Sequence, residues 1–380
     1  MEKKPFQTTN VVLLSFSHFV HDIYTSFLAP LLPLIIDKLS ISLGQAGVLS
    51  TMLQLPALLN PLIGALVDKK RLARWLVILT PSLTAVPMSL VGNVDSFAAL
   101  LFLFLLAGTS VALFHVPAPV LICQASGNQV GRGMSFYMAG GEAARMLGPL
   151  IGVGFVSLFG LDHFYPVMLF AIATSILLFL KLAPVEITPP PAKKATFSSA
   201  FTILGPVLVP LAGILSARAF MHSAMAVFLP VFVERQTGNL WLAGSALACY
   251  EAMGVVGVLT SGTLSDRMGK RRILFIALAA APVTLLGFVM STGVIRFTML
   301  LLTGFFILST TPVMLAVVQK AGKESPAAAN GLFMMVSFVV RSFTIVAVGI
   351  IGDHTGLETM YVISALAGFC ALPFLAKLKV

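Results

Sequence analysis

The sequence predicts an all-α membrane protein in which twelve transmembrane helices form two pseudo-symmetric six-helix bundles. Three observations predict it: the composition, the spacing of the apolar runs, and a repeat at half the chain length. Of the 380 residues, 58% are hydrophobic and 10% are charged, and the mean hydropathy is +1.00. A soluble protein of this length cannot cover so much apolar surface, so the chain is expected to be embedded in a lipid bilayer.

The apolar runs recur along the whole chain, and they approach or exceed the length of about 20 residues that a helix needs to cross a bilayer. A break rich in proline and lysine separates six runs from six others, and its consecutive prolines cannot continue a helix. The runs fall near residues 11–36, 45–67, 75–93, 97–122, 133–158 and 163–182, and then near 204–233, 242–264, 273–291, 296–319, 327–351 and 358–376.

The two halves of the chain resemble each other in detail. The segment 32–38 matches 229–235, Pro117 matches Pro312, and Gly133 matches Gly331, at offsets between 195 and 198 residues. A duplicated six-helix unit explains these matches, and repeats of this kind place a substrate cavity between the halves. We therefore predict an N-terminal bundle over 1–182, a cytoplasmic linker over 183–199 and a C-terminal bundle over 200–380.

The basic residues lie on one side of this predicted topology. Most of the 24 Lys and Arg residues fall in the termini and in every second loop, which places both termini in the cytoplasm and the chain in the inner (plasma) membrane. The net charge of +10 is explained by this asymmetry, so it does not indicate a nucleic-acid partner. The three cysteines lie singly in apolar runs, without the spacing of a disulfide or a metal site.

One loop combines small residues, an acid and a dense basic cluster between two apolar runs. It extends from Gly262 to Arg272, and a weaker copy begins at Gly64. This pattern resembles the signature loop of the major facilitator superfamily, which implies that each loop aspartate meets a basic side chain and a helix N-terminus and must separate as the halves rock. The glycines would let two helices approach closely. The predicted conformational gate comprises Gly64, Asp68, Lys69, Gly262, Asp266, Arg267, Gly269 and Lys270.

The first span carries ionisable side chains near its middle, where charge is costly and therefore suggests function. His18 and Asp22 are four residues apart and share a helical face, and His21 lies beside that face. An aspartate there can bind and release a proton, which makes Asp22 a candidate for proton coupling. A structural His–Asp pair that holds two helices together is the alternative. Tyr24 is included with the residues predicted to line the cavity.

Other spans carry ionisable residues as well. Arg218 and His222 lie four apart in the seventh span, and the repeat pairs Arg218 with His21. A buried arginine needs an anionic partner, either Asp22 or an acidic substrate. We expect substrate or cavity roles for His18, His21, Tyr24, His115, Arg218, His222 and Arg341, and proton-coupling roles for Asp22, Glu142 and Glu251.

The fifth span contains Glu142 and Arg145, three residues apart and able to neutralise each other as a buried ion pair. Its tail, Gly148, Pro149 and Gly152, resembles the fifth-span motif of drug/proton antiporters of the superfamily. That resemblance implies a kinked, closely packed interface with the other half. A generic small-residue packing face is the alternative.

Two further patterns resemble the fosmidomycin-resistance branch of the superfamily. They are the Ser-His-x-x-His-Asp sequence at 17–22 and the Phe-His-x-Pro sequence at 114–117, where Val116 separates the histidine from the proline. The prolines near His115 also break helical hydrogen bonding and predict a hinge. The resemblance implies export of a phosphonate-type drug in exchange for protons.

The leading hypothesis is a secondary active transporter that exports a small, anionic or amphiphilic drug-like compound by proton antiport and alternating access. The alternatives are uptake or facilitated exchange of an organic anion or metabolite, a metal-ion transporter that uses His18, His21 and Asp22, and a receptor or assembly factor. The sequence has no nucleotide-binding loop or hydrolase motif, so we expect no enzyme activity and no cofactor. The expected partners are a small-molecule substrate, protons and the lipid bilayer, and we expect a monomer.

Overall fold

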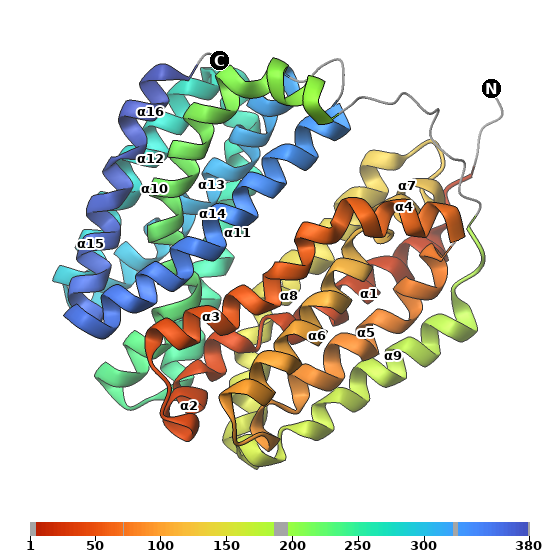
Figure 1. Cartoon of the computed structure of the whole chain (residues 1–380), viewed down its shortest axis with the longest axis horizontal. Coiled ribbons are helices and arrows are strands. Elements are labelled where there is room, and N and C mark those ends of the chain that lie inside the picture. The colour runs from red at the N-terminus through yellow and green to blue at the C-terminus, as the bar shows by residue number, and fades with distance from the viewer. Residues whose placement is uncertain (1–4, 71, 186–196, 322–325, 379–380) are drawn as a thin grey trace. The chain divides into compact units, whose positions relative to one another are not determined.

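A computed structural model describes residues 5–70, 72–185, 197–321 and 326–378, and within these ranges the ordered elements are all helices. The chain divides into two compact units (Figure 1). The first comprises Met1–Ile41 and Met52–Pro191, and the second comprises Ser42–Thr51 and Ala192–Val380. The all-α prediction is confirmed.

Eleven helices of the described chain are long and apolar enough to cross a membrane. The remaining predicted span, near 45–67, is interrupted: α3 (Leu43–Gln54) runs into a 3₁₀ turn, η1 (Leu55–Leu59), and then into α4 (Asn60–Lys70). Pro56 lies at the start of η1 and cannot donate the backbone hydrogen bond of a regular helix. The predicted spans therefore correspond to observed helices, with boundaries that differ by a few residues.

In the first unit, proline divides two of the predicted spans. Pro30 has no N–H for the carbonyl of Ser26, and the first span breaks there into α1 and α2. Pro117 separates α6 from α7 directly after His115, which confirms the helix break expected at that point. The helices of this unit, besides α4 and part of α3, are α1 (Thr8–Thr25), α2 (Leu28–Leu39), α5 (Ala73–Ser89), α6 (Phe97–His115), α7 (Ala118–Ala125), α8 (Val130–Phe159) and α9 (Met168–Lys181), with short 3₁₀ turns η2 (Val91–Asn93), η3 (Leu161–His163) and η4 (Tyr165–Val167).

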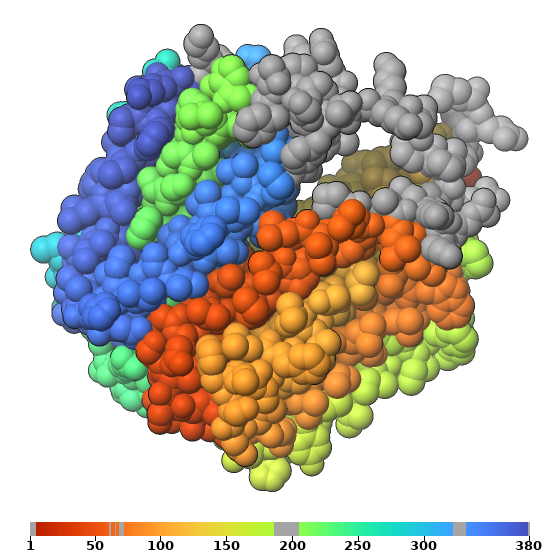
Figure 2. Space-filling model, viewed as in Figure 1, coloured from red at the N-terminus to blue at the C-terminus, as the bar shows by residue number. Residues whose placement is uncertain are grey.

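Small residues let the helices of the first unit approach closely. A Cβ at Gly140 of α8 would lie 2.4 Å from the carbonyl oxygen of Ser15 on α1, and one at Gly108 of α6 would lie 2.4 Å from that of Leu53. Figure 1 shows α5 between α6 and α9, and in Figure 2 the surface of η1 and α4 lies along that of α6. Within the same unit, α1 packs against both α8 and α5.

The second unit has longer, less interrupted helices. A buried apolar core that includes Leu211, Leu274 and Val317 holds α10, α12 and α13 together with α16. The helices are α10 (Phe197–Thr237), α11 (Leu240–Met268), α12 (Lys270–Met290), α13 (Gly293–Ala321), α14 (Pro326–Thr355), α15 (Leu357–Phe369) and α16 (Ala371–Lys377).

Residues 42–51 belong to the second unit because the start of α3 is bound to α14. The Asp353 carboxylate accepts hydrogen bonds from the backbone N–H groups of Leu43 (2.7 Å) and Gly44 (2.8 Å). A carboxylate is favoured at a helix N-terminus, where backbone donors have no partner within the helix. Gly349 allows the approach, since a Cβ there would lie 2.3 Å from the Leu43 carbonyl oxygen. The predicted linker lies largely outside the described residues, and α10 begins at Phe197.

Candidate functional site

Asp22 is the centre of a polar cluster inside the first unit, and three imidazole rings face its carboxylate. Nε2 of His18 lies 3.2 Å from Oδ2, Nε2 of His115 lies 3.4 Å from Oδ1, and Nδ1 of His21 lies 2.9 Å from Oδ1. His18 and Asp22 share a helical face, as their spacing predicts. His115 comes from α6, at the point where Pro117 ends that helix.

Backbone carbonyls fix the tautomer of two of these rings. Nδ1 of His18 donates to the carbonyl of Tyr137 (2.8 Å), and Nδ1 of His115 donates to the carbonyl of Val111 (3.1 Å). A carbonyl oxygen can only accept, so each Nδ1 carries a hydrogen. In its neutral form, each ring therefore directs the lone pair of Nε2 at Asp22.

A chain of hydroxyl groups fixes the tautomer of His21. Ser110 donates to the carbonyl of Thr80 (3.1 Å), and Thr84 donates to the hydroxyl of Ser110 (2.8 Å). Each hydroxyl has one hydrogen, so the Thr84 oxygen must accept from Nε2 of His21, at 2.9 Å. Nε2 of His21 therefore carries a hydrogen, and its Nδ1 faces Asp22.

These hydrogen bonds leave the cluster short of a proton. If Asp22 is ionised and all three rings are neutral, each ring nitrogen that faces the carboxylate presents a lone pair to it. The 2.9 Å contact between His21 and Asp22 is a hydrogen bond only when one more proton is present, either on His21 or on the carboxylate. The arrangement thus has room for at least one more proton, or another cation, between the rings and the carboxylate.

Exposure rises across the cluster from one side to the other. The His21 side chain is fully buried and the His18 side chain nearly so, whereas the side chain of Asp22 is 16% exposed and that of His115 is 37% exposed. The most exposed side of the cluster is therefore that of His115.

Aromatic stacking and a glycine hold the rings in place. The ring of His21 stacks on Phe114 with centroids 4.2 Å apart, and the ring of His18 stacks on Tyr137 at 4.0 Å. A Cβ at Gly141 would lie 2.6 Å from Cε1 of His18, so a residue other than glycine there would displace the ring. The small residues of α8 therefore position the site as well as pack the helices.

The equivalent position of the second unit holds Arg218 on α10. Its Nε donates to the carbonyl of Ile307 (2.9 Å) and its NH2 group to the hydroxyl of Thr311 (2.9 Å), both on α13. Both partners are neutral, and Arg218 makes no ion pair with a carboxylate among the described residues of the second unit. The buried guanidinium keeps its positive charge.

More ionisable residues surround Arg218 in the second unit. Nδ1 of His222 lies 3.2 Å from the hydroxyl of Tyr250, a fully buried side chain of α11. Arg218, Glu251 and Arg341 lie close enough to that hydroxyl for their charges to influence it, and the two guanidinium groups carry like charges. The structure thus brings Arg218, His222, Glu251 and Arg341 to one region of this unit.

The Tyr24 side chain lies in the core of the first unit, where it makes structural contacts. This side chain is fully buried. The Tyr24 hydroxyl donates to the carbonyl of Val167 (2.7 Å), and the hydroxyl oxygen accepts from the N–H of Ala171 (3.2 Å). The hydroxyl therefore links α1 to the start of α9, and it supplies the hydrogen-bond partners that these backbone groups need. Tyr361 makes a similar contact in the second unit, with the carbonyl of Ala224 (3.0 Å).

The fifth-span residues form α8. Glu142 and Arg145 make the expected ion pair, but the pair is not buried, since the Arg145 side chain is 47% exposed. Gly148 and Gly152 lie against Ser26 and Phe27, where added Cβ atoms would lie 2.5 Å and 3.0 Å from those side chains. Their observed contacts are within the first unit. Pro149 lies inside α8 without ending it.

The two signature loops differ in their surroundings. Gly64 makes only an ordinary contact with Val116, and no described atom lies within 4 Å of a Cβ built on Gly262. The close approach in α11 occurs earlier, at Gly257, where a Cβ would lie 2.4 Å from the Phe305 carbonyl oxygen. Asp68 and Lys69 lie in α4, and their side chains are outside the described set. The second loop ends α11 with Asp266 and Arg267 exposed, turns at Gly269 (φ +90°), and begins α12 at Lys270.

The cluster also offers side chains that could bind a metal cation. One atom from each of His18, Asp22 and His115 lies within 4.8 Å of the others. The sequence hypothesis had His21 in place of His115, but the chain through Thr84 engages one nitrogen of His21. Two Nε2 lone pairs and a carboxylate suit Zn²⁺, with Nδ1–H groups bound to carbonyls as metal-binding histidines usually have them.

Sequence reasoning missed Thr80, Thr84, Ser110 and Tyr137. They are common residue types in membrane helices, and their roles depend on which helices are neighbours. One signal was present: Thr80 and Thr84 are four apart, so they lie on one face of an otherwise apolar helix.

Comparison with known proteins agrees with this fold. The chain is 24% identical over 392 residues to the fosmidomycin resistance protein of Escherichia coli, covering 97% of this chain and 91% of that protein. It is 23% identical over 380 residues to the uncharacterized MFS-type transporter YfnC of Bacillus subtilis, covering 96% and 92%.

Solved structures show the same fold at low sequence identity. A mutant of the nucleoside transporter NupG superposes with a TM-score of 0.84 at 15% identity, covering 98% of this chain and all of that one. A bacterial homologue of the human lysosomal transporter Spinster, in an inward-facing and occupied conformation, superposes with a TM-score of 0.80 at 15% identity, covering 99% and 96%. The sequence profile of the Major Facilitator Superfamily matches residues 14–345. The chain therefore belongs to the major facilitator superfamily of membrane transporters.

Proposed function

We propose that this transporter exports a small anionic, drug-like compound in exchange for protons, by alternating access, and that the proton is held at Asp22. The observation that carries the proposal is the proton-deficient arrangement around the carboxylate. Three imidazole nitrogens face it, and the other nitrogen of each ring already donates elsewhere. Such a site takes up a cation when it is closed and releases it when its contacts change.

We assign different roles in proton binding to the residues of the cluster. His21 is buried and fixed by Thr84, so it holds its position while the proton moves. His115 is the most exposed ring and follows a helix break, so we assign it the exchange of protons with water. The states with and without the proton at Asp22 then differ in whether the rings of His115 and His18 stay in contact with the carboxylate.

The second unit supports an anionic substrate. Arg218 and Arg341 repel each other, and Arg218 is bound only to neutral partners in its unit. A carboxylate, phosphate or phosphonate would relieve that repulsion and form charge-assisted hydrogen bonds. The similarity to a fosmidomycin resistance protein favours fosmidomycin as the first probe.

The test is gradient-driven accumulation of labelled fosmidomycin in inside-out vesicles whose interior is held acidic. The wild-type protein should accumulate the drug, and Asp22→Asn should not. Asp162→Asn is the matched control, because Asp162 is an exposed acid that pairs with Lys38 (2.6 Å) in the same unit.

The outcomes separate the parts of the proposal. Accumulation by Asp22→Asn at the wild-type rate would exclude Asp22 as the proton site. Accumulation only when the outside is acidic would indicate uptake with protons instead of export. Absence of fosmidomycin transport by the wild-type protein, with transport of another organic anion, would change the substrate and leave the coupling intact.

Metal-ion transport is the second candidate, because His18, Asp22 and His115 place three ligand atoms within 4.8 Å of one another. Titration of the purified protein with Zn²⁺ tests it by calorimetry. Tight binding that is lost in His115→Ala, with no effect of pH gradients on drug flux, would favour the metal over the proton.

The orientation and the gate belong to the same proposal. We place both termini in the cytoplasm of an inner-membrane protein, following the distribution of basic residues. We also assign the two loop aspartates, Asp68 and Asp266, to contacts that break as the transporter changes state. Asp266→Asn should slow transport without loss of folded protein, as measured by initial rates in the vesicle assay and by size-exclusion chromatography.

A further inference from the structure

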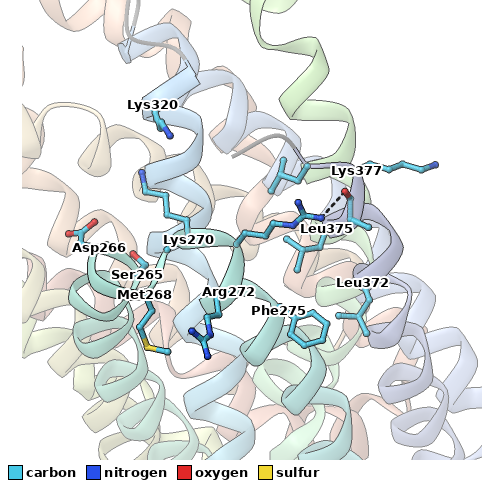
Figure 3. Close-up of a pocket in the computed structure, with 14 residues that line it drawn as sticks. Ser265, Asp266, Met268, Lys270, Arg272, Phe275, Lys320, Leu372, Leu375 and Lys377 are labelled. Carbon is cyan, nitrogen blue, oxygen red and sulfur yellow. Dashed lines mark hydrogen bonds between the residues drawn. The ribbon is translucent and has the colours of Figure 1, made fainter.

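We propose that the turn between α11 and α12 forms a binding site for an anionic phospholipid. A pocket of about 1280 Å³ opens there, bordered by the ends of four helices of the second unit (Figure 3). Five of its lining side chains are basic and one is acidic: Lys270, Arg271, Arg272, Lys320, Lys377 and Asp266. The balance of charge favours an anion.

Two of the basic side chains are held in place by backbone carbonyls. Nζ of Lys270 donates to the carbonyl of Ala316 on α13 (3.1 Å), and Arg271 donates from its NH2 group to the carbonyl of Ala376 on α16 (3.1 Å). An arginine has five N–H donors, so Arg271 keeps four for a ligand. In Figure 3, Lys270 and Lys320 extend on the same side of the turn, whereas Asp266 and Lys377 lie at opposite edges of the pocket.

The start of α12 adds uncharged donors to the same place. Its N-cap is Gly269, which has no side chain to accept from the first backbone N–H groups. These groups carry the positive end of the helix dipole, and such ends bind phosphate well. Arg272 makes no hydrogen bond or ion pair with another described residue, which leaves its guanidinium available.

The apolar part of the pocket distinguishes a lipid from a soluble anion. Phe275, which is 55% exposed, and Leu372 border the pocket just inside the predicted spans 273–291 and 358–376, and Met268 lies on its rim. A soluble phosphate would leave these side chains in contact with water. An anionic phospholipid places its phosphate among the cations and its acyl chains along Phe275, as basic pockets at the cytoplasmic ends of membrane helices do.

Native mass spectrometry of the full-length protein, released from detergent with added dioleoyl-phosphatidylglycerol, tests the proposal. The wild-type protein should retain phosphatidylglycerol in preference to dioleoyl-phosphatidylcholine. Combined Arg272→Gln and Lys320→Gln substitutions should weaken retention about 25-fold, from about fivefold for each basic residue near an anionic lipid. The matched control carries Arg132→Gln and Lys181→Gln, at two exposed basic residues near helix ends of the first unit.

Four results decide the matter. Weaker retention in the double variant, with wild-type retention in the control, supports the site. Equally weakened lipid retention in the double variant and the control, or unchanged retention in both, overturns the proposal. Displacement of the lipid by millimolar inorganic phosphate would also overturn it, in favour of a soluble-anion site. If the double variant does not elute as folded protein, the exposed single substitution Lys320→Gln should show the fivefold loss, and wild-type retention there would contradict the proposal.

Discussion

His21 and Arg218 occupy equivalent places in the two units, 197 residues apart, yet they build different electrostatic centres. His21 faces an aspartate and reaches α6 through a hydroxyl chain to Ser110. Arg218 reaches the corresponding helix, α13, directly and binds two neutral oxygens. The first centre can change its charge by one proton, and the second stays positive at any physiological pH.

The difference teaches how one duplicated unit can serve two purposes. A histidine beside an acid suits an ion that must come and go, whereas an arginine suits an anion that must be recognised. We therefore expect substitutions in the two centres to separate coupling from substrate binding. The first of four pairs of variants tests this division, and the other three test the packing and the hydrogen bonds that hold each unit together.

The largest effect should come from removing the charge of each centre. Asp22→Asn should abolish drug accumulation driven by a pH gradient but preserve exchange of labelled for unlabelled drug. Arg218→Gln should abolish both, because the anion loses its fixed partner. Vesicle flux with and without a gradient measures the two activities, and the division fails if Asp22→Asn also stops exchange while Arg218→Gln preserves it.

The next largest effect should come from α8, which packs the first centre closely. Gly140→Ala places a Cβ against the Ser15 carbonyl, which belongs to a helix backbone and cannot move aside, so we expect a loss of about 3 kcal/mol in the free energy of unfolding. Gly131→Ala on the same helix is the control. No atom of the described residues lies within 4 Å of its added Cβ, so stability should stay the same or rise by up to about 1 kcal/mol. Unfolding in mixed micelles titrated with a denaturing detergent would measure both, and equal changes would refute the packing account.

A smaller effect should distinguish the hydroxyl partners. Thr84→Val leaves a buried N–H of His21 without an acceptor and deprives Ser110 of its donor, at a cost of about 2 kcal/mol. Thr311→Val removes one of two contacts of Arg218 at an exposed position, where water can replace it, so its cost should stay below about 1 kcal/mol. The same unfolding titration compares them. A larger loss of stability for Thr311→Val would mean that the buried hydrogen bonds of Thr84 contribute less to the free energy of unfolding than their geometry implies.

The smallest effect should come from two buried tyrosines. Tyr24→Phe removes a partner from two backbone groups, and Tyr361→Phe removes one from a single carbonyl. We expect losses of about 1 kcal/mol for Tyr361→Phe and somewhat more for Tyr24→Phe. Because neither tyrosine belongs to a centre, both variants should transport at wild-type rates. A transport defect in Tyr24→Phe without loss of stability would restore it as a substrate residue.

Much of the fold followed from sequence because it depends on local properties. Apolar length predicts each span, and the prolines near His115 predict the break before α7, whereas the break between α1 and α2 was not predicted. The predicted span near 45–67 is interrupted in the structure by Pro56 and η1, an interruption that apolar length alone does not predict. The spacing of His18 and Asp22 also predicts their contact, because residues four apart meet on a helix.

The rest of the site depends on how helices cross, which no local pattern fixes. His115 is alone in its span, and only the packing of α1 against its neighbours brings it within 3.4 Å of Asp22. Tyr24 lies two residues after that aspartate, about half a helical turn away, so it points into the core instead. Thr84 and Ser110 gain their roles only because His21 lies between α5 and α6.

The most direct test of the central claim is release of protons when substrate binds. Purified protein in weakly buffered detergent solution, with a pH indicator, should acidify the solution when fosmidomycin is added, because the drug and the proton at Asp22 compete. Asp22→Asn should bind the drug without acidification, and Asp162→Asn should behave as the wild type. Equal acidification by Asp22→Asn and the wild type would contradict the account.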